Sequence, residues 1–184
     1  MAPKATVYKA ELEISDVDRG YYGSHALTLA QHPSETPERL MVRLFAFALF
    51  AHERLEFGRG LSSEDEPDLW RRSLTGEIEQ WIELGQPDEA RIRKACGRAR
   101  EVVVVGYSGR GFAIWWEKNA AALARCSNLV VVDLPAGTPE ALLPLLGRSM
   151  ALHALVQEGE LQLSSATEHV AVVPMLRQVP AVRS

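Results

Sequence analysis

Hydrophobic and polar residues alternate in two long stretches near the start of the chain. Residues 6–14 and 22–31 are rich in β-branched and aromatic side chains, and a period of two is the pattern of a strand with one buried face. Residues 16–20, between them, have the composition of a turn. We therefore expect an N-terminal antiparallel hairpin.

Four later segments carry signals of helix formation. In the first, Thr36 suits the cap position and Pro37 the first helical position. Apolar side chains then continue nearly all round the helix, which predicts that it is buried on most sides. The predicted helices cover residues 37–55, 89–100, 112–125 and 139–150.

The remaining segments have strand character. Residues 102–105 are four consecutive valines, and residues 129–134 are also apolar; such runs are typical of parallel strands buried on both faces. Pro174 suggests that the last strand, residues 169–178, lies at a sheet edge. Further strands are predicted at residues 55–61, around Asp68, and at 77–84, 152–157 and 160–164. The β-rich ends are expected to extend or cover a central α/β layer.

The segment from Pro67 to Lys94 holds the candidate chemistry. Strict alternation over residues 77–84 would place Glu77, Glu79, Trp81 and Glu83 on one face. Same-face carboxylates would then lie about 7 Å apart, and such like charges are tolerated more readily beside a divalent cation or a basic partner. The opposite face, with Ile78, Gln80, Ile82 and Leu84, is predicted to be buried. A solvated row of acids is the other interpretation of this face.

Composition restricts the class of protein. A hydrophobic fraction of 47% with 24% charged residues is that of a globular protein, and 184 residues suit a single domain over residues 1–184. The net charge of -4 argues against a protein that simply coats nucleic acid. Residues 40–51 are too short an apolar run to span a membrane. Cys96 and Cys126 match no metal-ligand spacing, so we predict reduced, buried thiols in a cytoplasmic protein.

Several segments, in order, resemble the bacterial YaeQ family over nearly the whole chain. They are HPSETPER at residues 32–39, DEPDLW at 65–70, WIELG at 81–85, PDE at 87–89, KAC at 94–96 and IWW at 114–116. That family is regarded as a variant of the PD-(D/E)XK nuclease fold. The resemblance implies an α/β (α+β) fold: a restriction-endonuclease-like mixed sheet flanked by helices, with antiparallel hairpins from the two terminal segments.

The resemblance also implies a metal site. Asp68, Glu79 and Glu83 would hold Mg²⁺ or Mn²⁺, which polarises a phosphate and activates water. Such nucleases place a lysine two residues after the second acid, but this chain has Trp81 or Gly85 there. Lys94 is the candidate for a relocated cation, and a solvated basic stripe on its helix is the equal alternative.

Other residues of this expected site have supporting roles. Arg71, Arg72, Arg91 and Arg98 would contact the nucleic-acid backbone. Glu35 or Glu38 could add a metal ligand, although charge compensation at the start of the first helix is the favoured interpretation.

Two functions are therefore expected. The first is a metal-dependent nuclease-like protein acting on DNA or RNA phosphodiesters. The second is a catalytically inactive relative that binds nucleic acid or a protein partner, for example in transcription or repair. The missing lysine and the acidic net charge favour the second.

Overall fold

The chain forms two compact units. The computed structural model describes residues 4–59 and 65–181. One unit contains the chain up to Glu53 together with residues 138–173, and the other contains residues 54–137 with those from Pro174 onward. The prediction of a single domain stays a prediction, and each unit is described by itself. Within the described ranges, no helix is long and apolar enough to cross a membrane.

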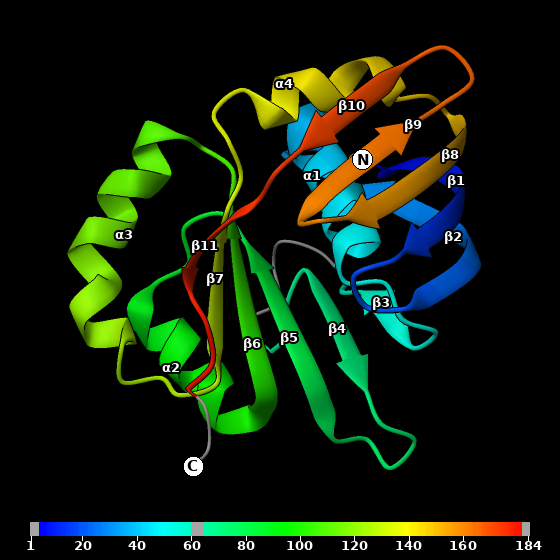
Figure 1. The fold of residues 1–184 in the computed structure, drawn as a ribbon. Coiled ribbons are helices and arrows are strands. Elements are labelled where there is room, and N and C mark those ends of the chain that lie inside the picture. Colours follow the sequence, from blue (N-terminus) through cyan, green and yellow to red (C-terminus); the bar gives the residue numbers. More distant parts are fainter. Residues whose placement is uncertain (1–3, 60–64, 182–184) are drawn as a thin grey trace. The chain divides into compact units, whose positions relative to one another are not determined.

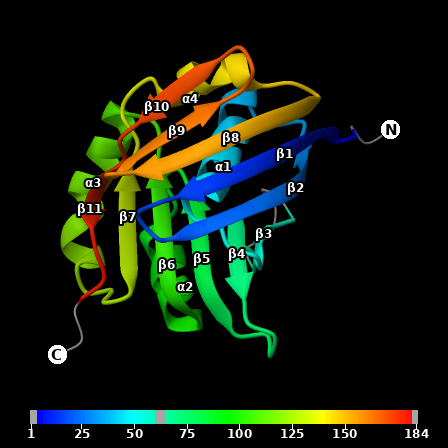
Figure 2. The same ribbon diagram turned by 45° about the vertical axis from the view of Figure 1, so that its right-hand side comes forward.

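The first unit is built on a five-stranded sheet. Figure 2 shows its strands in the order β10-β9-β8-β1-β2. β1 and β2 pair antiparallel over eleven residues without a register shift, which confirms the predicted hairpin, and β8 joins β1 in parallel. The strands are β1 (Thr6–Asp16), β2 (Tyr21–Gln31), β8 (Ser149–Gln157), β9 (Glu160–Ser164) and β10 (His169–Val172).

Helix α1 (Pro37–Leu49) begins as the sequence predicts. The Thr36 hydroxyl accepts a hydrogen bond from the Arg39 backbone N–H, and Pro37 occupies the first turn. Nine of its thirteen residues are buried, as expected for a helix with apolar residues nearly all round. The helix ends six residues earlier than residue 55, because residues 55–57 pair as a strand instead.

The predicted helix over residues 139–150 is wrong. Helix α4 (Thr138–Leu142) is short and is followed by a 3₁₀ turn, Leu143–Leu145. Pro144 lies at this point, and a proline inside a helix removes a backbone donor and clashes with the preceding turn. Met150 belongs to strand β8.

The second unit is built on a six-stranded sheet. Its order is β11-β7-β6-β5-β4-β3 (Figure 1), with β5, β6 and β7 parallel and the other neighbours antiparallel. The two mixed sheets and the helices establish a mixed α+β architecture. The strands are β3 (Leu55–Phe57), β4 (Leu69–Arg72), β5 (Ile78–Leu84), β6 (Ala99–Gly106), β7 (Leu129–Asp133) and β11 (Met175–Gln178).

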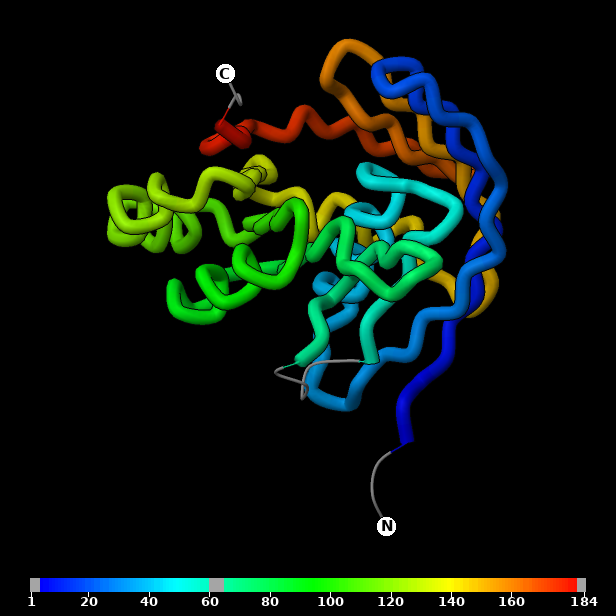
Figure 3. Tube along the Cα trace, turned by 90° about the horizontal axis from the view of Figure 1, so that it is seen from below, coloured from blue at the N-terminus to red at the C-terminus, as the bar shows by residue number. Residues whose placement is uncertain are grey.

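Two helices cover one face of this sheet. Figure 3 shows α2 (Glu89–Arg98) and α3 (Arg110–Leu123), in green and yellow-green, side by side there. Phe112 of α3 packs so closely on β6 that a Cβ at Gly106 would lie 2.2 Å from its ring. Glycine at position 106 is therefore a packing requirement.

Residues 169–178 form two strands in two sheets, so the prediction of one continuous strand is wrong. Both strands nevertheless pair antiparallel and lie at a sheet edge, as predicted. β10 pairs with β9 in the first unit, whereas β11 pairs with β7 in the second. Pro174 stands between them. Proline has no backbone N–H to donate to a neighbouring strand. The pairing of β10 with β9 therefore ends before Pro174, and the residues after it pair with β7.

Candidate functional site

A β-bulge in β5 overturns the predicted row of acids. Arg71 pairs with Gln80 and Arg72 with Ile78, so Glu79 is an extra residue between the two pairs. Ile78 packs against the hydrophobic cluster of Trp81, which places Ile78 rather than Glu79 on the tryptophan's face. An inserted residue breaks strict alternation and re-aims the neighbouring side chains.

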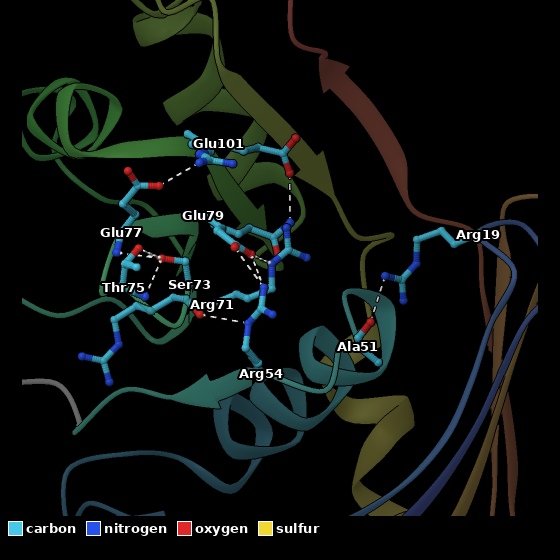
Figure 4. Close-up of polar contacts among 12 residues, drawn as sticks. Arg19, Ala51, Arg54, Arg71, Ser73, Thr75, Glu77, Glu79 and Glu101 are labelled. Atoms are coloured by element: carbon cyan, nitrogen blue, oxygen red, sulfur yellow. Dashed lines mark hydrogen bonds and ion pairs between the residues drawn. The ribbon is translucent and has the colours of Figure 1, made fainter.

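Glu79 lies between two arginines from neighbouring strand segments. Arg54 donates to both of its carboxylate oxygens, at 2.9 and 2.8 Å, and Arg71 donates to one of them at 2.8 Å. Figure 4 shows both guanidinium groups converging on this carboxylate. The hydrogen bonds and charge of Arg54, with a further contribution from Arg71, lower the pKa of Glu79. The carboxylate of Glu79, which was predicted to bind a metal ion, accepts hydrogen bonds from two arginines instead.

The structure brings the other two predicted acids together. The pairing of Leu69 with Ile82 places Asp68, just before β4, beside Glu83 near the end of β5. Asp68 Oδ2 accepts a hydrogen bond from the Leu84 backbone N–H at 2.8 Å. The Asp68–Glu83 pair therefore lies where a parallel strand ends, the edge at which α/β sheets usually place their sites.

Glu83 is a buried acid with two donors on one oxygen. Its exposed fraction is 6%. Glu83 Oε1 accepts from the Trp81 indole at 2.9 Å and from Arg91 Nε at 2.7 Å. Burial, and then the charge of Asp68, raise the pKa of Glu83, and Arg91 and Trp81 only partly offset this. The pair is consequently a site where added positive charge would stabilise the ionised form.

Trp81 organises the basic residues of α2. Its ring is only 1% exposed, and the guanidinium carbons of Arg91 and Arg98 lie 5.8 and 5.3 Å from its centroid. The predicted basic stripe consists of Arg91, Lys94 and Arg98. Arg91 and Arg98 contact the sheet through Trp81, while Lys94 is exposed on the same helix. The cation on Glu83 is Arg91, and the predicted role of Lys94 stays a prediction.

The remaining predicted arginines contact protein groups in the second unit. Arg71 bonds to Glu79, as described. Arg72 lies 4.4 Å above the Trp70 ring and 3.7 Å from a carboxylate oxygen of Glu56. Both of these arginines keep part of their surface exposed, so contact with a nucleic-acid backbone stays a prediction.

Glu35 and Glu38 belong to the first unit. Glu35 is 6% exposed and accepts from Arg43 at 2.7 and 2.9 Å and from Arg39 at 2.9 Å. It forms a buried ion-pair cluster beside α1. Glu38 lies in the first turn of α1, where a negative charge is favourable. These positions suit the structural interpretation of both acids better than a role as metal ligands.

Sequence reasoning missed two features of the second unit. One is Arg54, which no motif marks and which reaches Glu79 only because β3 and β4 pair. The other is the contact between Cys96 and Cys126, whose thiols are hydrogen-bonded. Both thiols are free, as predicted, but they are only partly buried. Burial and the neighbouring Cys126 raise the pKa of Cys96 to about 12, which makes this thiol poorly reactive at neutral pH.

The donor chemistry suits a small metal site. Among the described residues, no three His, Cys, Asp or Glu side chains cluster as a metal cage. Mg²⁺, however, is commonly held by one or two carboxylates, with waters and substrate phosphates completing its shell. Asp68 and Glu83 fit that smaller requirement. Glu79 is the bulged residue, and its carboxylate is bonded to Arg54 and Arg71 instead.

Comparison with known proteins gives consistent matches. The family model described as YaeQ protein matches residues 1–174. The YaeQ proteins of Salmonella typhi and Escherichia coli K12 are 45% and 44% identical over 98% and 94% of this chain, covering 100% and 95% of their own lengths.

Two solved structures are also similar. The crystal structure of YaeQ from Xanthomonas axonopodis pv. citri has a TM-score of 0.93 and 59% identity, covering 96% of this chain and 99% of that one. The structure of YaeQ from Pseudomonas syringae has a TM-score of 0.87 and 34% identity, with coverages of 95% and 96%.

Proposed function

This chain belongs to the YaeQ family, and from this premise we propose that it is a metal-dependent nuclease-like protein with a variant PD-(D/E)XK site on Asp68 and Glu83. The six-stranded sheet with α2 and α3 would be the restriction-endonuclease-like core. The observation that carries the proposal is the buried Glu83 beside Asp68, with its pKa raised by burial and by that neighbour. A repelling carboxylate pair of this kind gains from a divalent cation.

Each residue of the site has a part in this proposal. Asp68 and Glu83 would hold Mg²⁺ or Mn²⁺, and the ion when bound would supply Lewis-acid stabilisation of the scissile phosphate. Trp81 and Arg91 both donate to Glu83 Oε1, and in this proposal Oε2 would bind the cation. Arg91 supplies the positive charge that the missing lysine would provide, and Trp81 fixes the orientation of Glu83.

Nucleic-acid cleavage tests the proposal. Plasmid, single-stranded DNA and RNA would be incubated with the protein and Mg²⁺ or Mn²⁺, alongside Asp68→Asn and Glu79→Gln. Asp68→Asn should abolish cleavage, while Glu79→Gln should retain it because Glu79 binds arginines outside the pair. Cleavage that persists in a folded Asp68→Asn variant would refute the assignment.

A catalytically inactive binding protein is the second candidate. The observation that favours it is that Glu79 and Glu83 are each bound by arginine, as in purely structural ion pairs. This candidate predicts that a nucleic acid or protein partner stays bound in EDTA and after Asp68→Asn. Binding that requires the metal would count against it.

A further inference from the structure

One edge of the five-stranded sheet lacks the usual protection against pairing. Exposed sheet edges in proteins are normally blunted by shortness, charge, proline or a bulge. The other edge strands, β10, β3 and β11, are only three or four residues long, and β11 also carries Arg177 and a register irregularity. β2 is eleven residues long, runs in unbroken register with β1 and contains no Lys, Arg, Asp, Glu or Pro.

The outer side of β2 has backbone groups available for pairing. Arg43 Nη2 donates to the Ala30 carbonyl at 2.9 Å, which shows that this carbonyl is directed away from β1. Backbone groups of alternate strand residues point the same way, so those of Tyr22, Ser24, Ala26 and Thr28 share this direction. Among the described residues, no other backbone group pairs with this stretch.

The side chains of these residues are also compatible with a close partner. Ser24, Ala26, Thr28 and Ala30 are small and uncharged, and they lie exposed on the outer face of the sheet. The adjacent strand β1 has charged residues on that face, Lys9, Glu11 and Glu13. The exposed side chains of the edge strand are therefore uncharged, whereas those of its neighbour β1 carry charge.

We propose that β2 pairs antiparallel with β2 of a second copy of this chain, joining the two five-stranded sheets across a two-fold axis near Ala26. An antiparallel strand pair is self-complementary, so one edge serves both copies. A neutral strand meets its own copy without the like-charge repulsion that opposes pairing of charged edges. The Ala30 carbonyl stays bonded to Arg43 and takes no part in this pairing. Because a single strand pair buries little surface area, we expect the dimer to be weak.

Sedimentation equilibrium with two matched lysine variants tests this interface. Ala26 and Ala151 are both exposed and both pair with Glu11, from opposite sides. Ala26 is on the edge strand, whereas Ala151 is in β8 inside the sheet. At about 300 μM, a concentration suited to a weak interface, the native chain and Ala151→Lys should approach twice the 20.3 kDa of one chain. Ala26→Lys should remain monomeric, since lysine is a natural blocker of edges.

Cysteine cross-linking gives an independent measurement. Ala26→Cys places two thiols at the axis, where paired Cα atoms lie about 5.5 Å apart, and mild oxidation should give a covalent dimer. Ala151→Cys should not, because about five strand spacings, roughly 24 Å, separate the two copies of that position. A monomeric native chain at about 300 μM, equal dissociation by the two lysine variants, or equal cross-linking of the two cysteine variants would overturn the proposal.

Discussion

Replacing Arg91 by methionine would leave Glu83 as a buried carboxylate beside Asp68. Methionine keeps much of the length of the side chain but removes the 2.7 Å ion pair to Glu83 and the 3.0 Å hydrogen bond to the Glu66 carbonyl. Removing one partner of a buried ion pair typically costs about 3–5 kcal/mol, because an uncompensated charge remains. Glu83 is 6% exposed, so water replaces little of this loss.

The expected loss is measurable as a shift in melting temperature. For a chain of this length, each kcal/mol corresponds to about 2–4 °C, so Arg91→Met should melt about 6–20 °C below the native protein at neutral pH. Urea denaturation followed by circular dichroism would give the free energy of unfolding directly.

The pH dependence has a definite sign. Burial and Asp68 raise the pKa of Glu83, and loss of Arg91 raises it further. A carboxyl group whose pKa is raised in the folded state gives stability that is full below its unfolded pKa and is lost as pH rises through the folded pKa. The deficit of Arg91→Met should therefore be largest at neutral pH and should shrink as the pH falls.

The double variant Glu83→Gln/Arg91→Met is the control. Glutamine carries no charge and can still accept from Trp81, so the double variant should recover most of the lost stability. A deficit of less than about 0.5 kcal/mol for Arg91→Met, the range of ordinary surface substitutions, would refute the reasoning. So would a double variant no more stable than the single one.

Three further predictions concern the second unit. Gly106→Ala should destabilise it by about 3 kcal/mol through overpacking against Phe112, whereas Gly97→Ala, whose Cβ meets nothing within 4 Å, should stabilise α2 by about 0.5–1 kcal/mol; equal melting shifts would contradict this. Cys96, with a pKa of about 12, should react with iodoacetamide at pH 8 on the order of 10³-fold more slowly than a free thiol, and mass spectrometry showing equal rates in native and unfolded protein would disprove it. Because the pKa of Glu79 is lowered, its stabilisation exists above the ordinary pKa and is lost as pH falls through the folded pKa; Glu79→Gln should therefore melt lower than the native protein at neutral pH, and the difference should vanish in acid. An unchanged difference across that range would argue against the arginine pair as the cause.

Local signals in the sequence were sufficient for most elements of the fold. The β1–β2 hairpin follows from alternation, the start of α1 from Thr36 and Pro37, and the buried strand β6 from its valines. Errors occurred where one proline changes the course of the chain. Pro144 and Pro174 were present in the sequence, but the consequence of each depends on which sheet the following residues join.

The site was less predictable because it depends on pairing between strands. A bulge at Glu79 exists only through the register of β4 against β5, and no glycine at that position marks it. The proximity of Asp68 and Glu83 follows from the antiparallel pairing of β4 with β5, and their role as one metal site stays a prediction. Arg91, rather than Lys94, contacts Glu83 because of how α2 is rotated about its own axis. The spacing of basic residues along the sequence does not determine this rotation.

Calorimetric titration of Mn²⁺ tests the Asp68–Glu83 site most directly. The titration would use the native protein, Asp68→Asn and Glu79→Gln, with circular dichroism to establish that all three are folded. We predict micromolar to low-millimolar binding by the native protein, loss of binding in Asp68→Asn and retention in Glu79→Gln. Equal binding by the native protein and Asp68→Asn, or no binding by the native protein, would contradict the metal site proposed here.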